Sequence, residues 1–431
     1  MKTANRIATA TAAVLFAGAA LSTSAARAET TALTGATIHP VAAPAIENGT
    51  IVIEDDRIAV LGREVGIPAD ATVIELEGRH VYPGFVHPLS ALGLTEISSV
   101  AGTVDTDEMG SINAALRVEV AFNHDSELLP VNVAGGILTT HTVPGGGLIR
   151  GSSAVMRMSG WSWEDMIIKA PAGMHINFPP GAASDADNDD LVKINEVLDA
   201  ARAWRKAQQA FEAGDAPRPA MNDQLQALVP LLEGELPLFL YAGKQDEIEA
   251  ALDWAGEQEF ERVVLVAGPD AQYVAERLAE DGIPVILNGV YQMPTRRWEP
   301  YDMAYAAAGK LHQAGVKFAI GDGGGGFAAT NARNLPFHAG SAAAFGLPKD
   351  AALKSVTLWP AEILGVADEL GSLEPGKRAT LMVTDGDPLE PTTHIDRVWI
   401  DGDEYDLGRS KHRQLYERYR DRIRTQMQAE E

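Results

Sequence analysis

Short apolar segments alternate with amphipathic segments through the middle of the chain. Four apolar segments have the length and composition of buried strands: 238–241, 263–266, 284–287 and 317–320. The segments between them have the polar and apolar spacing of helices, and they cover 245–257, 271–280 and 304–314. Strand, helix and strand in this succession predict parallel strands joined by right-handed crossovers.

Two architectures fit this succession, an open doubly wound sheet and a closed (β/α)₈ barrel. The stretch between the two β-rich ends of the chain is long enough for eight strand–helix units. No G-x-G-x-x-G motif follows a first strand, as it would in a dinucleotide-binding sheet. We therefore predict an α/β protein with a (β/α)₈ TIM barrel over residues 83–365.

The two ends of the chain share a different pattern. Residues 34–78 contain short apolar runs separated by turns such as Asn48-Gly49, and residues 379–401 contain two more such runs. Two distant segments of like character predict one small β-sandwich domain, built from residues 29–82 plus 366–408. A C-terminal helix is expected over 409–431.

Two long helices carry apolar stripes. In the segment 190–214 the stripe residues are Leu191, Ile194, Leu198 and Ala201, and core packing is their expected role. In the basic C-terminal helix they are Leu415, Tyr419, Ile423 and Met427. Docking on the acidic body of the protein is the favoured interpretation of the second stripe, and membrane binding is the alternative.

The first 28 residues have the pattern of a secretory signal peptide. Lys2 and Arg6 precede the apolar run 7–21, and Ala26-Arg27-Ala28 has the form of a cleavage motif. Cleavage before Glu29 would make the protein periplasmic or secreted. The apolar run is too short for a membrane span and no later stretch reaches membrane length, so no span is expected.

Charge and cysteine content exclude several classes of function. The formal net charge is −25, which disfavours nucleic acid and anionic membranes as partners. The chain contains no cysteine, so disulfides, thiolate metal sites and cysteine nucleophiles are excluded.

Several short motifs occur in a fixed order along the chain. They are Asp55-Asp-Arg-Ile-Ala-Val-Leu-Gly62, the segment 67–78, Val81-Tyr-Pro-Gly84, the segments 356–365 and 370–377, and Gly386-Asp-Pro-Leu389. In this order and at these separations, the sequence resembles the amidohydrolase superfamily, in its imidazolonepropionase-like branch. The resemblance covers nearly all of the chain after residue 28. It implies a (β/α)₈ barrel that carries a small β-sandwich built from both chain ends.

The resemblance also implies a chemistry, which is hydrolysis of an amide-type C–N bond in a small molecule or peptide. Members of the family activate water with one or two divalent metals, such as Zn or Mn, at the C-terminal mouth of the barrel. Their usual ligands are two histidines on strand 1, a carboxylated Lys or a Glu on strand 4, histidines on strands 5 and 6, and an Asp after strand 8.

Most of that ligand set is missing when it is carried over to this sequence. The strand-1 histidines fall on Leu89 and Ala91, and the stretches 240–244 and 264–268, which match strands 5 and 6, contain no histidine. Only the strand-8 acid remains, as Asp322. One carboxylate cannot hold a catalytic metal. We therefore expect no metal ligands and no cofactor, and Zn or Mn only if the family chemistry survives.

The remaining polar candidates lie near expected strand ends. His141 follows an apolar stretch and Asp322 opens a Gly-rich loop, so both are candidate catalytic residues. Arg333 and His338 lie just beyond and are candidate substrate-binding residues. His141 could equally be a hydrogen-bonded structural histidine, and Arg333 could anchor its own loop. His87 precedes a proline, and a structural role is expected for it.

Three functions remain open. The first is a C–N hydrolase of the amidohydrolase type, and the second is a non-catalytic pseudoenzyme that binds a small-molecule or peptide ligand. Such a pseudoenzyme could also bind an amidohydrolase-like partner or form a homo-oligomer. The third is metal-free acid–base hydrolysis by His141 and Asp322. Polar groups converging on an open mouth would indicate an enzyme, and a packed mouth would favour the binding module.

Overall fold

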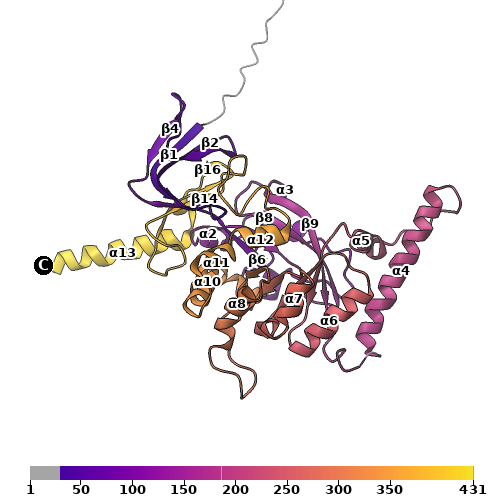
Figure 1. Ribbon diagram of the computed structural model, residues 1–431. Coiled ribbons are helices and arrows are strands. Elements are labelled where there is room, and N and C mark those ends of the chain that lie inside the picture. The colour runs from indigo at the N-terminus through magenta and orange to yellow at the C-terminus, as the bar shows by residue number, and fades with distance from the viewer. Residues whose placement is uncertain (1–29, 186, 431) are drawn as a thin grey trace, which may run out of the picture.

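The computed structural model describes residues 30–185 and 187–430. The predicted signal peptide, residues 1–28, lies outside the described residues. Two large sheets organise the chain, with helices packed around one of them (Figure 1).

The first sheet is a nearly closed barrel of eight strands that follow one another in chain order. The strands are β6 (Phe85–Ser90), β7 (Ile137–Thr142), β8 (Ile149–Arg157), β9 (Ile167–Asn177), β10 (Leu238–Tyr241), β11 (Val263–Ala267), β12 (Val285–Leu287) and β13 (Phe318–Ile320). The four strands predicted from apolar runs correspond to β10–β13. The predicted barrel is therefore confirmed.

One barrel strand runs against its neighbours. β8 is antiparallel to both β7 and β9, whereas the pairs from β9 to β13 are all parallel. The connection from β7 to β8 spans only residues 143–148, which is too short for a helical crossover. Gly146 and Gly147 turn it with φ values of 60° and 70°, a conformation that favours glycine. As a result, β8 starts at the barrel end where the other strands finish.

The barrel is closed by a segment that is not part of the eight strands. β6 and β13 are the two ends of the strand order. Between them, the Ile320 N–H donates to the Ser355 carbonyl at 3.0 Å, and the Val86 N–H donates to the Val356 carbonyl at 2.9 Å. We call this place, where β6 and β13 face each other across residues 355–356, the barrel seam.

Side chains fill the inside of the barrel. One apolar cluster combines residues from seven barrel strands: Val86, Leu89, Val155, Ala172, Phe239, Val264, Val266, Ile286 and Ala319. Residues of α12 (Leu358–Leu364) belong to the same cluster. The interior is thus a packed core rather than a pore.

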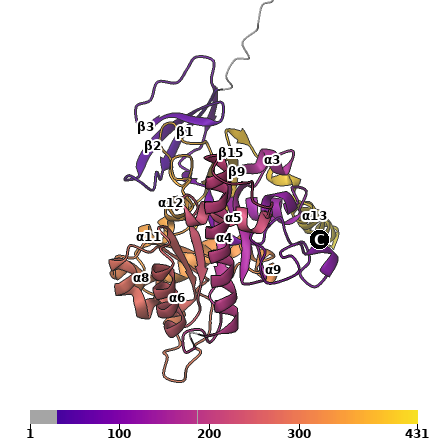
Figure 2. The ribbon, with the colours of Figure 1, turned by 90° about the vertical axis from the view of Figure 1, so that its right-hand side faces the viewer.

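Helices cover the outside of the barrel (Figure 2). They include α4 (Asp189–Glu212), α5 (Asp223–Leu232), α6 (Gln245–Glu257), α7 (Ala275–Glu280), α8 (Met303–Gln313), α10 (Leu335–Ala344) and α11 (Lys349–Lys354). The stripe predicted on α4 is buried at each of its four positions. Asn188 starts that helix by accepting hydrogen bonds from the N–H groups of Asp190 and Leu191.

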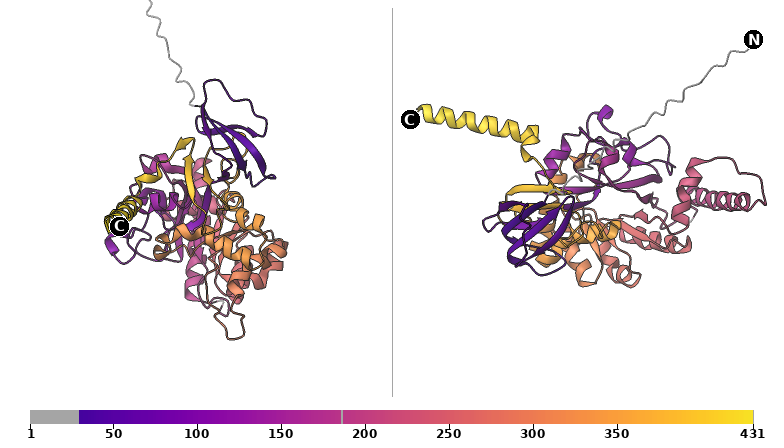
Figure 3. Two further views of the ribbon diagram at one scale, coloured as in Figure 1. Left: turned by 90° about the vertical axis from the view of Figure 1, so that its left-hand side faces the viewer. Right: turned by 90° about the horizontal axis from the view of Figure 1, so that it is seen from above.

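The second sheet joins the two ends of the chain (Figure 3). Its strands are β1 (Thr30–Ile38), β2 (Ile46–Glu54), β3 (Arg57–Gly62), β4 (Thr72–Glu75), β5 (His80–Pro83), β14 (Leu381–Thr384), β15 (Ile395–Ile400) and β16 (Asp403–Glu404). The antiparallel pair β5–β14 connects the N-terminal to the C-terminal strands. The strands form one continuous sheet around a core that includes Leu33, Ile51 and Trp399.

A buried carboxylate links this sheet to the barrel. Asp401 accepts hydrogen bonds from Arg157, at the end of β8, at 2.7 Å and from Arg378 at 2.9 Å. The Thr380 hydroxyl donates to its second oxygen at 3.1 Å. Two cations and a hydroxyl thus share one acid at the junction.

The C-terminal helix α13 (Lys411–Glu430) projects away from the body (Figures 1 and 3). The four predicted stripe residues are 48%, 55%, 57% and 64% exposed, in chain order. The expected docking of this stripe on the protein's own body is therefore wrong. The helix continues outward from a short turn at Leu407–Arg409, and Lys411 in its first turn pairs with Glu127. Among the described residues, no helix combines the length and apolar character needed to cross a membrane.

The Asp401 junction yields a test of how the two sheets are held together. We expect Asp401→Asn to lower the free energy of unfolding by about 2 kcal/mol, because two half-buried arginines lose a charged acceptor. Urea unfolding followed by circular dichroism measures this change. The exposed neighbour Asp403 is the control, and Asp403→Asn should leave the midpoint unchanged. Equal midpoints for both variants would contradict a junction held by Asp401.

Candidate functional site

The polar side chains inside the barrel form two groups. The first, which we call the seam pair, consists of His87 and Asp322. The second, which we call the inner histidine network, consists of His141, Ser153, His175 and Tyr241. The positions of the inner histidine network follow from the alternation of side chains along the strands, because every second residue of a barrel strand faces inward. The seam pair does not follow from it, because the register of β6 is irregular around His87 and Asp322 lies in the loop after β13.

The seam pair connects the first strand to the loop after the last one. His87 Nε2 lies 3.3 Å from Asp322 Oδ2, and both side chains are nearly inaccessible to solvent. The Leu89 N–H points at His87 Nδ1 at 3.3 Å. A nitrogen that accepts a hydrogen bond carries no proton, so Nε2 is the protonated nitrogen that faces Asp322.

Asp322 is held as a carboxylate. Burial raises the pKa of its carboxyl group, but His87, the Gly324 N–H and His338 together outweigh burial and lower the pKa below its usual value. The Gly324 N–H donates to Asp322 Oδ1 at 3.3 Å. The loop after β13 is thus folded back on the acid that opens it.

Leu89 packs against the loop that begins at Asp322. Leu89 and Ala91 are each only 2% exposed. A Cβ atom added at Gly324 would lie 2.7 Å from the Leu89 side chain, and the φ of Gly324 is +67°. Glycine is therefore required for the loop to pack directly on Leu89. Packing against Leu89 accounts for this glycine of the loop.

The side chains of His141, Ser153 and His175 in the inner histidine network are fully buried. His141 Nδ1 lies 2.7 Å from the Pro88 carbonyl oxygen, and its Nε2 lies 2.7 Å from the Ser153 hydroxyl. A carbonyl only accepts, so Nδ1 carries the proton and Nε2 accepts from Ser153. Burial, opposed in part by the bond to Pro88, lowers the pKa of His141 to about 4. His141 is therefore neutral near pH 7.

His175 belongs to the same network and was missed by the sequence analysis. Its Nδ1 lies 2.9 Å from the Tyr241 hydroxyl, and its ring stacks on Phe239. Burial holds its pKa well below the usual value, with further lowering by His141 and Arg150. Burial also raises the pKa of Tyr241 to about 12. The Nε2 atom of His175 is buried without a hydrogen-bond partner among the described residues.

A signal for His175 existed in the sequence. The residues on either side of it, Met174 and Ile176, belong to the apolar core between the barrel and its helices. Alternation along β9 therefore places His175 on the opposite face, inside the barrel. Reading that alternation would have identified it.

The structure brings together only some of the predicted site residues. His338 lies close enough to Asp322 to act on its pKa, and burial lowers the pKa of His338 itself to about 4. Among the described residues, no hydrogen bond or ion pair joins His141 to Asp322. His87 contacts the acid, and His141 bonds the next residue, Pro88. Arg333 is exposed and donates to the Thr330 carbonyl in its own loop. Catalytic or binding roles for these residues stay predictions.

A divalent metal does not fit the residues at this mouth. A catalytic site of this kind requires three or more nitrogen or oxygen ligands from the protein. Among the described residues, no group of three His, Asp or Glu side chains is arranged to hold a metal ion. His87 presents an N–H to Asp322 instead of a lone pair, and Leu89 packs beside that acid.

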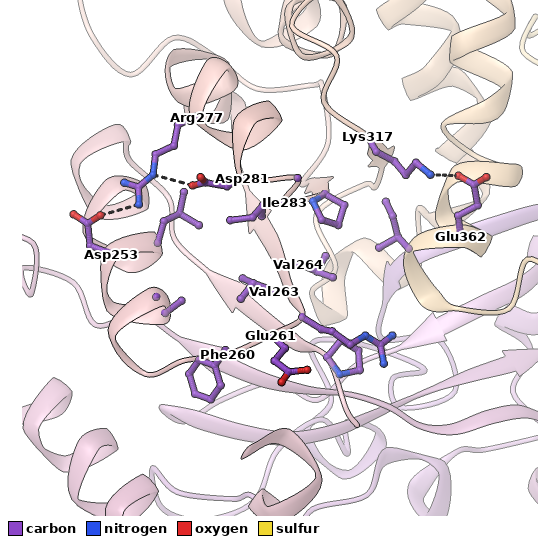
Figure 4. Close-up of a pocket in the computed structure, with 18 residues that line it drawn as sticks. Asp253, Phe260, Glu261, Val263, Val264, Arg277, Asp281, Ile283, Lys317 and Glu362 are labelled. Atoms are coloured by element: carbon purple, nitrogen blue, oxygen red, sulfur yellow. Dashed lines mark hydrogen bonds and ion pairs between the residues drawn. The ribbon is translucent and has the colours of Figure 1, made fainter. Parts of the chain in front are cut away.

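A cavity of about 640 Å³ lies at the other end of the barrel (Figure 4). It is lined by residues that directly precede strands: Pro237, Arg262, Pro284 and Lys317. Its charges pair among themselves, since Lys317 contacts Glu362 at 2.6 Å and Arg277 contacts both Asp253 and Asp281. Barrel enzymes place their chemistry at the C-terminal ends of the strands. This cavity lies at the N-terminal ends of the strands, where residues of barrel enzymes usually stabilise the fold rather than take part in catalysis.

Comparison with known proteins identifies the architecture. Residues 246–404 match the sequence model of the amidohydrolase family. The crystal structure of an amidohydrolase from Thermotoga maritima MSB8 superposes with a TM-score of 0.80 at 24% identity, covering 87% of this chain and 99% of that one. The chain has the amidohydrolase fold.

Other proteins with the amidohydrolase fold are similar over most of the chain. Amidohydrolase tasK of Hapsidospora irregularis is 25% identical over 402 residues, which are 83% of this chain and 39% of that protein. The chain thus spans about two fifths of the length of this curated relative. A zinc-bound adenosine deaminase from Xanthomonas campestris superposes with a TM-score of 0.52 at 17% identity, covering 91% and 98% of the two chains.

The buried histidines make stability depend on pH. The pKa of His141 is about 4 in the folded state and about 6.5 when unfolded. Between these values the unfolded chain binds a proton that the folded chain does not, so stability falls as the pH falls. We expect His141 alone to cost about 2 kcal/mol between about pH 7 and about pH 5, measured by urea unfolding.

Two variants test this origin of the pH dependence. His141→Gln should make the loss of stability on acidification smaller, because glutamine can keep both hydrogen bonds without titrating. His412→Gln, on the exposed face of α13, should leave the loss unchanged. An unchanged pH slope in His141→Gln would show that His141 does not cause it.

Proposed function

We propose that this protein is an amidohydrolase-family relative, of the imidazolonepropionase-like branch, that now acts as a non-catalytic binding module. Its ligand would be a small molecule or a peptide. The observation that carries the proposal is the seam pair under Leu89. Packing and one His–Asp contact fill the place where the family's first-strand histidines would hold a metal.

The state of each buried histidine supports this proposal. His141 uses both ring nitrogens for hydrogen bonds within the barrel, and His87 accepts one from the Leu89 N–H at Nδ1; both side chains are fully buried. A general base needs a lone pair within reach of substrate. Together with the apolar interior cluster around Phe239, these side chains form part of the barrel core.

A second function is favoured by one observation, the ionised Asp322 beside the neutral His338. The loop that follows Asp322 is open to solvent at Gly323, Gly325 and Phe327. A carboxylate and an imidazole beside an exposed loop could activate water for metal-free hydrolysis of a C–N bond. We rank this function below the binding module because the Asp322 side chain is only 3% exposed.

The predicted signal peptide supports export of the protein. We propose that the protein is exported and works in the periplasm or beyond the cell. The acidic composition is compatible with that location, and it disfavours nucleic acid as the ligand.

Metal content is the first test of the binding module. Protein made without an affinity tag and dialysed should retain far less than one zinc or manganese per chain, measured by inductively coupled plasma mass spectrometry. The reason is that too few ligands converge at the mouth. The control is Asp322→Asn, which should have the same metal content as the parent. One equivalent of metal in the parent, reduced in Asp322→Asn, would show a metal site at Asp322.

Turnover is the second test and separates the two functions. N-acyl amino acids and dipeptides should not be hydrolysed above the uncatalysed rate, as measured by release of free amine. If hydrolysis is found, Asp322→Ala with an unchanged circular dichroism spectrum should abolish it. Metal-free turnover that depends on Asp322 would replace the binding module with the second function.

A further inference from the structure

Helix α13 presents an apolar face that no other described part of the chain covers. Its stripe of four residues is exposed, and Tyr416 adds a fifth apolar side chain at 66% exposure. An isolated helix of about this length is only marginally stable in water, because most helices in proteins are stabilised by packing of one face. The exposed stripe therefore requires a partner surface.

The charges of α13 follow the edges of its stripe. At about 100° per residue, the five apolar side chains fall within an arc of about 120°. One edge of the arc carries Lys411, Arg418 and Arg422, and the other carries Arg413, Arg420 and Arg424. The two acidic residues between Lys411 and Gln428, Glu417 and Asp421, fall on the back of the helix. The binding face is thus apolar in the middle and basic on both sides.

Three of these cations are unpaired. Arg418, Arg422 and Arg424 make no ion pair within the part of the chain that the structure describes, whereas Arg413 pairs with Glu417. The partner surface therefore has to supply acidic groups beside an apolar surface.

The rest of this chain supplies the acidic groups. The helix up to Gln428 carries six of the 35 Lys and Arg residues of the chain but only two of its 60 Asp and Glu residues. Opposite charge steers association and sets register between surfaces. A second copy of the same chain offers an acidic body that matches the basic edges of α13.

We propose that α13 docks on the acidic body of a second copy of this chain, so that two copies exchange their C-terminal helices. The contact is isologous, because each copy gives its helix to the other. Pairing of two α13 helices is disfavoured, since it brings basic edges together. Docking on an anionic membrane is disfavoured, since it brings the acidic body to a surface of like charge. The inference is independent of whether the barrel is catalytic.

Sedimentation of the full chain without a tag tests the proposal. At low salt the protein should be a dimer at tens of micromolar. Ile423→Glu places a carboxylate in the stripe and should raise the dissociation constant at least about tenfold. Thr425→Glu introduces the same charge on the back of the same helix, and its dissociation constant should stay within about twofold of the parent.

Salt separates the proposed contact from a helix–helix contact. Raising sodium chloride from about 50 mM to about 500 mM should weaken a dimer held by opposite charges. A dimer that tightens with salt would show pairing of two basic helices and would overturn the docking on the body.

Two further outcomes would also overturn the proposal. One is a parent protein that stays monomeric at about 50 µM in low salt. The other is flotation of a monomeric parent with vesicles of anionic phospholipid, lost in Ile423→Glu, which would assign α13 to a membrane surface. Equal dimerisation of the parent and Ile423→Glu would show that the interface lies elsewhere.

Discussion

Closure of the barrel at its seam is the constraint that determines how the side chains at the barrel mouth are arranged. The strand order ends at β6 on one side and β13 on the other. The backbone of residues 355–356, the His87–Asp322 contact and the packing of Leu89 on Gly324 all join these two sides. Asp322 is turned toward His87 and its side chain is only 3% exposed, so the contact that helps to close the barrel also shields this acid from solvent.

Burial decides the state of the polar groups behind the seam. Histidines with no access to water stay neutral, because an unpaired charge in a packed interior costs more than its hydrogen bonds return. His141 and Ser153 satisfy each other, and Pro88 fixes the orientation of the ring. The contact between the His141 ring and the Ser153 hydroxyl is enclosed in the barrel, and a catalytic role for His141 stays a prediction.

The protein divides its charge unevenly between its parts. The barrel and the second sheet carry nearly all of the acidic excess, and α13 carries a concentration of arginines on an otherwise apolar face. Surface acids keep such a body soluble and repel like-charged surfaces. The projecting helix is the one long element whose apolar face the rest of the described chain leaves in water. The apolar face and the arginines of α13 suit contact with an acidic protein surface better than contact with water.

Local pattern alone determined a large part of this molecule. Uniformly apolar runs of four residues located β10–β13, periodic spacing located α6 and the buried stripe of α4, and like patterns at both ends indicated one shared sheet. These features depend on side-chain periodicity, which the sequence contains directly. The direction of β8, the His87–Asp322 contact and the outward course of α13 were decided by the tertiary structure. Each depends on contacts between segments that are far apart in the sequence. The two members of the seam pair, His87 and Asp322, are 235 positions apart. Side-chain periodicity does not predict contacts of this kind. The absence of histidine at positions 89 and 91 could be read from the sequence, whereas the packing of Leu89 against Gly324 of the last loop required the closed barrel.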